Sequence, residues 1–298
     1  MPPFWKRYQQ DRIITVENLQ SGSQVYETEF GLVECACTGT GPAVLISHGG
    51  SGGYDMGVWL AGLLGGEYQY IAPSRFGYLR TPIPENSTPK NQADSFASLL
   101  DTLNITSAFI IGLSSGGPSA LQFAFRHPGR CLGLIMLSAI SRQIPPLPLI
   151  LRLIFPFMLK SDFIPWSIYS INPDFVYRSN GVNRDLLSKI KFDQEKMNLL
   201  STLFQTSFPT SLRREGIVND MQQVAVFPTD FIERIVSPTL VVHAVNDPIV
   251  PIDLGEYSAQ KIPGANILKL TEGGHFCTVT HREEIVPVIR NFLDRSGS

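Results

Sequence analysis

The sequence predicts an α/β protein: a mostly parallel sheet covered by helices on both faces and interrupted by a helical insertion. First, the 298 residues are 43% hydrophobic and 17% charged, so a sizeable core can be buried. Second, short apolar runs alternate with segments of helical spacing, as in sheets with helical crossovers. Third, this alternation stops between residues 141 and 235, where Pro, Phe, Leu and Ile accumulate without strand patterning. We therefore predict a core of residues 1–140 and 236–298 with an insertion of residues 141–235.

The individual elements follow from local patterns. Residues 24–30 alternate as a strand, and Gly31 turns the chain into a second strand over residues 32–37, which predicts an antiparallel hairpin. Apolar runs typical of buried strands lie at 43–47, 68–72, 108–113, 132–138, 239–244 and 267–270. Helical spacing predicts helices at 95–103, 116–127 and 283–292, and over 183–204 within the insertion.

The strongest chemical signal is Gly112-Leu113-Ser114-Ser115-Gly116, a G-x-S-x-G pattern between an apolar strand and a helix. A serine on such a sharp turn sits in strained backbone, and side chains two residues away on either side would collide across it. The glycine spacing selects Ser114 as the nucleophile over Ser115, because Ser115 has Leu113 two residues before it. The backbone N–H of Ser115 begins the following helix, where it can face developing negative charge as part of an oxyanion hole.

A serine hydroxyl needs a base to become a good nucleophile. Of five histidines, His275 lies in a glycine-containing loop between the last predicted strand and the last helix, which makes it the candidate. The acid that orients it must follow a core strand between Ser114 and His275, and Asp247 does so. The alternative position, after the strand that ends at Ser138, contains no carboxylate. The predicted catalytic residues are thus Ser114, Asp247 and His275.

A second oxyanion donor is predicted in the glycine-rich loop 48–53 that follows the strand at 43–47. Gly50 is the candidate donor, with Ser51 as the alternative. A phosphate-binding loop is disfavoured, because the stretch lacks the lysine of G-x-x-x-x-G-K-[ST] and does not fit G-x-G-x-x-G.

Together these motifs resemble the α/β-hydrolase superfamily across nearly the whole chain. They are Ser47-His48-Gly49-Gly50, Gly112-Leu113-Ser114-Ser115-Gly116, His127-Pro128-Gly129-Arg130, Asn246-Asp247-Pro248-Ile249-Val250-Pro251 and Gly273-Gly274-His275-Phe276. The resemblance implies that the insertion is a helical cap and that the apolar residues 144–159 line an acyl or hydrophobic pocket. Candidate substrate contacts are Ser51, Phe155 and Phe157. One departure is residues 74–78, Ser-Arg-Phe-Gly-Tyr, where many members carry Asp-x-Arg-Gly or similar.

The predicted activity is hydrolysis of a hydrophobic carboxylic ester through an acyl-enzyme intermediate. Three alternatives share the same motifs: a carbon–carbon bond hydrolase, a cofactor-free haloperoxidase-like enzyme and a ligand-binding receptor. A haloalkane dehalogenase is disfavoured, because its nucleophile would be Asp where this chain has Ser114.

The expected partner is a small hydrophobic substrate, with no cofactor and no metal. Four unevenly placed cysteines do not complete a zinc-site pattern. A net charge of −2 without a long basic run gives no basis for nucleic-acid binding. No apolar signal segment precedes the core, so a cytoplasmic location is expected. The sequence carries no indication of oligomeric state.

The most apolar stretch, residues 144–171, is interrupted by prolines and charges and does not predict a membrane-spanning helix. We expect its aromatic residues Phe155, Phe157, Phe163 and Trp166 to pack onto the core. Contact between these side chains and a lipid surface is the alternative.

Overall fold

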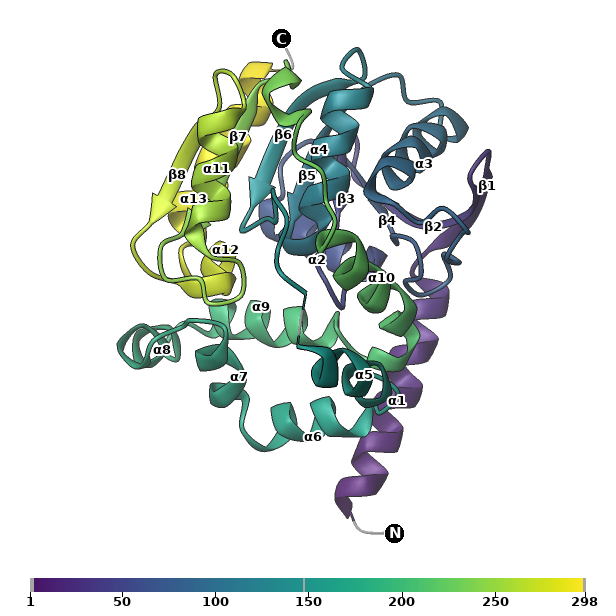
Figure 1. Ribbon diagram of the computed structural model, residues 1–298. Coiled ribbons are helices and arrows are strands. Elements are labelled where there is room, and N and C mark those ends of the chain that lie inside the picture. Colours follow the sequence, from purple (N-terminus) through teal and green to yellow (C-terminus); the bar gives the residue numbers. More distant parts are fainter. Residues whose placement is uncertain (1–2, 147, 297–298) are drawn as a thin grey trace.

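The computed structural model describes residues 3–146 and 148–296, and its described part contains one eight-stranded sheet with helices on both faces (Figure 1). The strand order is β1-β2-β4-β3-β5-β6-β7-β8. β2 pairs antiparallel with β1 and β4, and the remaining pairs are parallel. The strands are β1 (Gln24–Thr28), β2 (Gly31–Thr38), β3 (Ala43–Ser47), β4 (Gln69–Pro73), β5 (Ala108–Leu113), β6 (Cys131–Leu137), β7 (Thr239–Ala244) and β8 (Asn266–Leu270). The predicted fold class is confirmed.

Two helical layers cover the sheet. Helices α2 (Tyr54–Leu64) and α13 (Arg282–Ser296) pack on one face, and α3 (Pro89–Thr102), α4 (Gly117–Arg126) and α11 (Ile252–Lys261) pack on the other. Successive strand side chains point to opposite faces. In β3, accordingly, Val44 and Ile46 join the cluster of α2, while Ala43 and Leu45 join the cluster of α3. Burial on both sides explains why the central strands are apolar throughout.

The segment between β6 and β7 contains helices and lies beyond the carboxyl ends of the parallel strands (Figure 1). We call α5–α10 together with η2 the cap helices. They are α5 (Leu149–Met158), α6 (Phe163–Ile171), α7 (Pro173–Ser179), α8 (Arg184–Ile190), α9 (Gln194–Gln205), η2 (Thr210–Arg213) and α10 (Arg214–Val224). The helix predicted over residues 183–204 is two helices, because the Asp193 side chain accepts the amide of Lys196 and caps a new N-terminus.

The end of the predicted insertion packs against the core. After α10, Phe227, Phe231 and Ile232 join the buried cluster that contains α3 and α4; Ile232 begins the short helix η3 (Ile232–Arg234). The insertion boundary at residue 235 therefore does not coincide with the end of the cap helices.

A helix that the sequence reading did not predict, α1 (Pro3–Ser21), runs along the cap (Figure 1). Its Tyr8 packs with Trp166 and Phe208, and Phe163 packs against this group. The α1 side chain of Arg12 donates to Asp162 at 2.9 Å. Phe163 and Trp166 of α6 thus pack mainly on α1 and not on the sheet.

No helix within the described residues combines the length and apolarity needed to cross a bilayer.

Candidate active site

Ser114 sits at the sharp turn between β5 and α4, at the start of the short helix η1 (Ser114–Gly116). Its φ of 51° lies in the left-handed region, which is costly for a residue with a side chain and is often found at functional sites. A Cβ on Gly112 would lie 2.8 Å from Ala120 Cβ, so no side chain fits there. A Cβ on Gly116 would lie 2.1 Å from the carbonyl oxygen of Ser47. The glycine at 116 is therefore required by the close approach of β3 and not, as argued from the sequence, by a collision across the turn.

Ser114, His275 and Asp247 form a continuous chain of hydrogen bonds. Ser114 Oγ is 3.0 Å from His275 Nε2, and His275 Nδ1 is 2.8 Å from Asp247 Oδ2. An ionised carboxylate only accepts hydrogen bonds, so Nδ1 carries the ring proton and Nε2 is left to accept the serine proton. The three residues predicted from separate motifs thus lie together, in an arrangement suited to nucleophilic catalysis.

Backbone contacts hold the loop that carries His275. The amide of His275 donates to the carbonyl oxygen of Asn180 at 2.7 Å, which ties this loop to the cap. Gly273 and Gly274 have φ values of 113° and 58°. These left-handed conformations favour glycine, and they let the chain turn sharply after β8.

Asp247 is buried and well supplied with donors. Its Oδ1 accepts the amides of Ile249 and Val250 at 2.9 and 3.0 Å, which leaves Oδ2 free for His275. Burial alone would raise the pKa of this carboxyl group, but the hydrogen bond and charge of His275 and the two amides outweigh burial and lower the pKa. Asp247 is therefore ionised at neutral pH and can stabilise a charged imidazole.

The glycine loop after β3 lies against the Ser114 turn. A Cβ on Gly50 would lie 3.2 Å from Ser115 Oγ, and a Cβ on Gly49 would lie 3.3 Å from Ser114 Cβ. Ser51 has a φ of 58°, and its hydroxyl donates to the Gly50 carbonyl oxygen at 2.7 Å. Both proposed oxyanion segments therefore flank the nucleophile.

A cavity of about 480 Å³ opens beside Ser114, within the size range of ligand sites. Its lining includes the candidate catalytic residues Ser114 and His275 and the glycine-loop residues Gly49, Gly50 and Ser51. Most of the remaining lining residues are apolar and come from both the core and the cap helices: Met56, Trp59, Leu113, Phe155, Leu159, Pro165, Val176, Leu203, Phe204, Phe208, Ile217, Ile249, Phe276 and Val279.

Of the two phenylalanines predicted to contact substrate, only Phe155 lines the cavity. Phe157 is 68% exposed and faces away, so the prediction is corrected for this residue. The reason is helical geometry: two residues along α5 correspond to a rotation of about 200°, so the two rings point in opposite directions. Within the predicted pocket stretch 144–159, Leu147 and the side chains of residues 151–152 lie outside the described residues.

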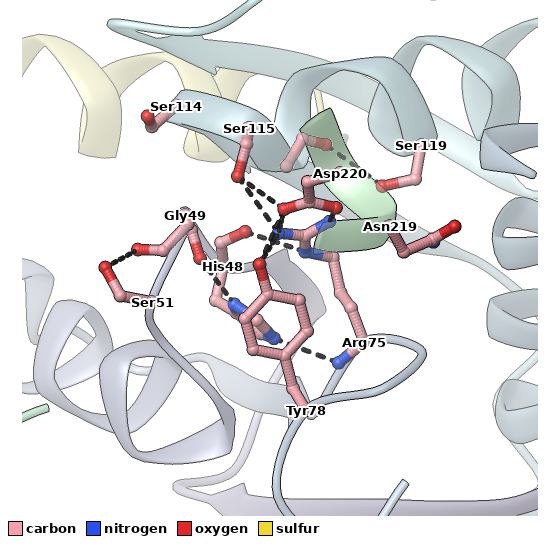
Figure 2. A network of polar contacts seen from close by, with 12 residues as sticks. His48, Gly49, Ser51, Arg75, Tyr78, Ser114, Ser115, Ser119, Asn219 and Asp220 are labelled. Carbon is pink, nitrogen blue, oxygen red and sulfur yellow. Dashed lines mark hydrogen bonds and ion pairs between the residues drawn. The ribbon is translucent and has the colours of Figure 1, made fainter. Parts of the chain in front are cut away.

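A buried polar network lies behind the nucleophile and was not predicted from the sequence (Figure 2). Ser115 Oγ turns away from Ser114 and towards Asp220 and Arg75, at 2.9 and 3.0 Å. In the sequence, Arg75 stands out only as part of the departure from the family pattern at residues 74–78. Asp220 comes from α10, in the part of the sequence that carries no motif, so no local signal could have identified it.

Among the residues that the structure describes, no group of three or more His, Cys, Asp or Glu side chains is placed to hold a metal ion.

The chain shares its fold and much of its length with known hydrolases. Residues 42–165 match the family described as alpha/beta hydrolase fold. The chain is 27% identical over 252 residues to an uncharacterised hydrolase, YcgS, of Bacillus subtilis, covering 82% of this chain and 88% of that protein. It is 26% identical to the 2-hydroxymuconate semialdehyde hydrolase of Pseudomonas putida, covering 75% of this chain and 76% of that protein.

A solved structure extends the likeness across nearly the whole chain. The alpha/beta hydrolase fold protein from Nakamurella multipartita has a TM-score of 0.78 and 29% identity, over 93% of this chain and 100% of that one. The parallel sheet and the strand-to-helix turn at Ser114 agree with these matches, and we conclude that the chain has the α/β-hydrolase fold, as do the hydrolases to which it is similar.

Proposed function

We propose that this protein is a serine hydrolase that cleaves a hydrophobic carboxylic ester through an acyl-enzyme intermediate. The observation that carries the proposal is the hydrogen-bonded chain Ser114–His275–Asp247 at one end of an apolar cavity. A base within hydrogen-bond reach of the nucleophile, itself oriented by a carboxylate, is the arrangement that this chemistry requires.

In the proposed reaction, His275 Nε2 takes the proton of Ser114 while Oγ attacks the ester carbonyl carbon. The oxygen that becomes negative is held by the N–H groups of Gly50 and Ser115. When this intermediate collapses, the C–O bond to the alcohol breaks and the alcohol leaves with the proton from His275. A water molecule then gives a proton to His275 and attacks the acyl group, and the carboxylic acid departs as Ser114 regains its proton.

The cavity lining favours a neutral, apolar substrate. Apart from Asn180, Ser207 and Thr210, the cap contributes apolar side chains to the lining, such as Phe155, Leu159 and Val176. Burial of an acyl or alcohol chain against such side chains stabilises the complex by about 25 cal/mol per Å² of apolar surface.

Carbon–carbon bond hydrolysis is the second candidate, because a relative is named as a hydrolase of 2-hydroxymuconate semialdehyde. That substrate carries a carboxylate, and a buried carboxylate needs a cationic or hydrogen-bonding partner. The cavity-lining residues within the described part of the chain include no lysine or arginine, so a carboxylate would meet only neutral donors such as Asn180, Ser207 and Thr210 away from His275. We therefore place ester hydrolysis first.

The test is a panel of p-nitrophenyl acetate, butyrate, octanoate and dodecanoate beside a vinylogous diketone acid. We expect the butyrate and octanoate esters to be turned over and Ser114→Ala to lose at least about 10³-fold in kcat. Ser188→Ala, which changes an exposed serine of α8, serves as the matched control. Turnover of the diketone with no ester hydrolysis would favour the second candidate, and full activity in Ser114→Ala would refute both.

A further inference from the structure

A buried ion pair joins the cap to the turn that carries the nucleophile. Arg75 follows β4 in the core, and Asp220 lies on the cap helix α10. Arg75 Nη1 and Nη2 donate to the two carboxylate oxygens of Asp220, each at 2.6 Å, and the two side chains are only 6% and 14% exposed. Burying two charges is costly unless their hydrogen bonds are satisfied, so the other contacts of this pair are informative.

The remaining donors of Arg75 reach both backbone segments of the proposed oxyanion hole. Its Nη2 donates to Ser115 Oγ at 3.0 Å, and its Nε donates to the carbonyl oxygen of His48 at 2.9 Å. The backbone N–H of Arg75 also donates to His48 Nε2 at 2.9 Å. Arg75 therefore contacts both sources of the proposed oxyanion N–H groups. One is Ser115 itself, and the other is the loop that begins at His48 and contains Gly50.

Asp220 completes this arrangement from the cap. It accepts the hydroxyl of Ser115 at 2.9 Å and the hydroxyl of Tyr78 at 2.6 Å (Figure 2). Ser115 Oγ thus donates to Asp220 and accepts from Arg75, which fixes its rotamer away from Ser114. Burial, and then the charge of Asp220, raises the pKa of Tyr78, so the phenol stays protonated as a donor.

His48 is held in one tautomer by the same contacts. Its Nε2 accepts the Arg75 amide, so Nδ1 carries the proton, and Nδ1 lies 2.8 Å from the carbonyl oxygen of Gly49. Burial, and then the charge of Arg75, keeps the pKa of His48 well below its usual value. The His48 imidazole is therefore neutral, and its two hydrogen bonds hold the start of the glycine loop in place.

We propose that Arg75 is a positioning residue that fixes the positions of Ser115 and the glycine loop relative to each other. It does so only while Asp220 of the cap forms the ion pair with it. The position of α10 on the core and the ability of the oxyanion hole to bind a negatively charged oxygen are then coupled. This inference rests on the proposed function, because it assigns Gly50 and Ser115 as the oxyanion donors.

A second ion pair provides the matched control. Arg213 of η2 donates to Asp55 of α2 at 2.5 Å, and these side chains are 0% and 17% exposed. This pair also joins cap to core through a buried arginine, but it makes no hydrogen bond to Ser115 or His48. If the two ion pairs only hold the cap against the core, breaking either pair should reduce the reactivity of Ser114 by the same factor.

The experiment compares Asp220→Asn with Asp55→Asn and measures the rate at which a tagged fluorophosphonate modifies Ser114. In that reaction Oγ attacks phosphorus, fluoride leaves, and His275 takes the serine proton, while a phosphoryl oxygen occupies the oxyanion hole. We expect Asp220→Asn to slow the modification by about 10- to 100-fold, as misplacement of an oxyanion donor should. Asp55→Asn should change the rate by less than about threefold, because neither Asp55 nor Arg213 hydrogen-bonds to Ser115 or His48. With an ester substrate, the loss in Asp220→Asn should appear in kcat, with KM nearly unchanged.

Two further variants separate geometry from charge and from folding. Arg75→Lys keeps the charge, but a single ammonium group cannot reproduce the hydrogen bonds of Arg75 to Asp220, Ser115 and His48 together. We therefore expect the rate of modification to fall by a factor similar to that in Asp220→Asn. Ser115→Ala keeps the ion pair and the backbone N–H but removes the hydroxyl link, and we expect a rate about three- to tenfold lower. It remains informative even if Asp220→Asn does not fold.

Equal losses in Asp220→Asn and Asp55→Asn, full activity in Arg75→Lys, or an unchanged rate in Ser115→Ala would each overturn the inference. Failure of the reagent to modify Ser114 in the wild-type protein would overturn both the inference and the proposed function. Modification of Ser114 without any ester hydrolysis would overturn the ester assignment alone.

Discussion

The core side of the cavity takes its polar residues from loops at the ends of strands, whereas the cap side is built from helices that supply mainly apolar side chains. Ser114, Asp247 and His275 follow β5, β7 and β8. Phe155 and Val176 come from α5 and α7. The core side therefore depends on backbone geometry that few residue types can adopt, while the cap side needs only suitable volume. Substitutions on the two sides should consequently change different kinetic quantities.

On the core side, Asp247→Asn should have the largest effect. An amide cannot hold the His275 proton on Nδ1 as the carboxylate does, so kcat should fall by about 10³- to 10⁴-fold at neutral pH. Steady-state kinetics on p-nitrophenyl butyrate would measure this loss. A decrease below tenfold would show that Asp247 is not the orienting acid.

On the cap side, Val176→Phe should change substrate choice more than rate. The larger ring would occupy part of the cavity, so the ratio of kcat/KM for dodecanoate over acetate should fall by about tenfold. Acetate turnover should remain near the wild-type value. The control is Phe175→Val on the same helix, because Phe175 is 57% exposed. Equal effects of the two substitutions would contradict the assignment of α7 to the substrate wall.

The two sides should also differ in their response to acid. His48 and His243 are fully buried in the core, and burial is the main cause of their lowered pKa values, whereas residues 141–235 contain no histidine. Below about pH 6.5 the unfolded chain binds protons that the folded chain does not. The free energy of unfolding should therefore decrease as the pH falls below about 6.5, by at most about 1.4 kcal/mol per pH unit for each histidine.

Urea denaturation at pH 8, 6 and 5 would measure this change. His243→Gln should make the pH dependence less steep, and a profile with unchanged slope would exclude His243 as a source. His243 Nε2 lies 2.7 Å from the Val250 carbonyl oxygen, which a glutamine amide can also reach as a donor.

The smallest effect is expected at Phe157, on the outer face of α5. Because its ring lies outside the cavity, Phe157→Ser should leave kcat/KM for a soluble ester within about twofold of wild type. A vesicle-sedimentation assay with the same variant would test the alternative of lipid contact. A large kinetic loss with the soluble ester would show that Phe157 reaches the substrate after all.

Sequence reasoning succeeded where a residue is demanded by local backbone geometry. The strands at Ala43–Ser47, Ala108–Leu113 and Thr239–Ala244 have the predicted bounds, because continuous apolar runs mark buried parallel strands. Ser114 was distinguishable from Ser115 because glycines stand two residues before and after it, and the structure leaves no room for a Cβ at either position, Gly112 against α4 and Gly116 against β3.

Sequence patterns did not predict features that depend on contacts with residues far away along the chain. Phe157 was grouped with Phe155 because both are aromatic, and their directions depend on how α5 docks. Helix α1 lacks a strong apolar stripe, and it is held by packing against α6.

The sequence by itself determined the eight strands along the chain and the three residues of the candidate catalytic chain, since each lies in a pattern of a few adjacent residues. Only the tertiary structure decided which side chains line the cavity and that Asp220 meets Arg75 behind Ser115. The physical reason is range: turns and strands are governed by neighbours along the chain, whereas a buried ion pair joins residues 145 positions apart and leaves no local pattern.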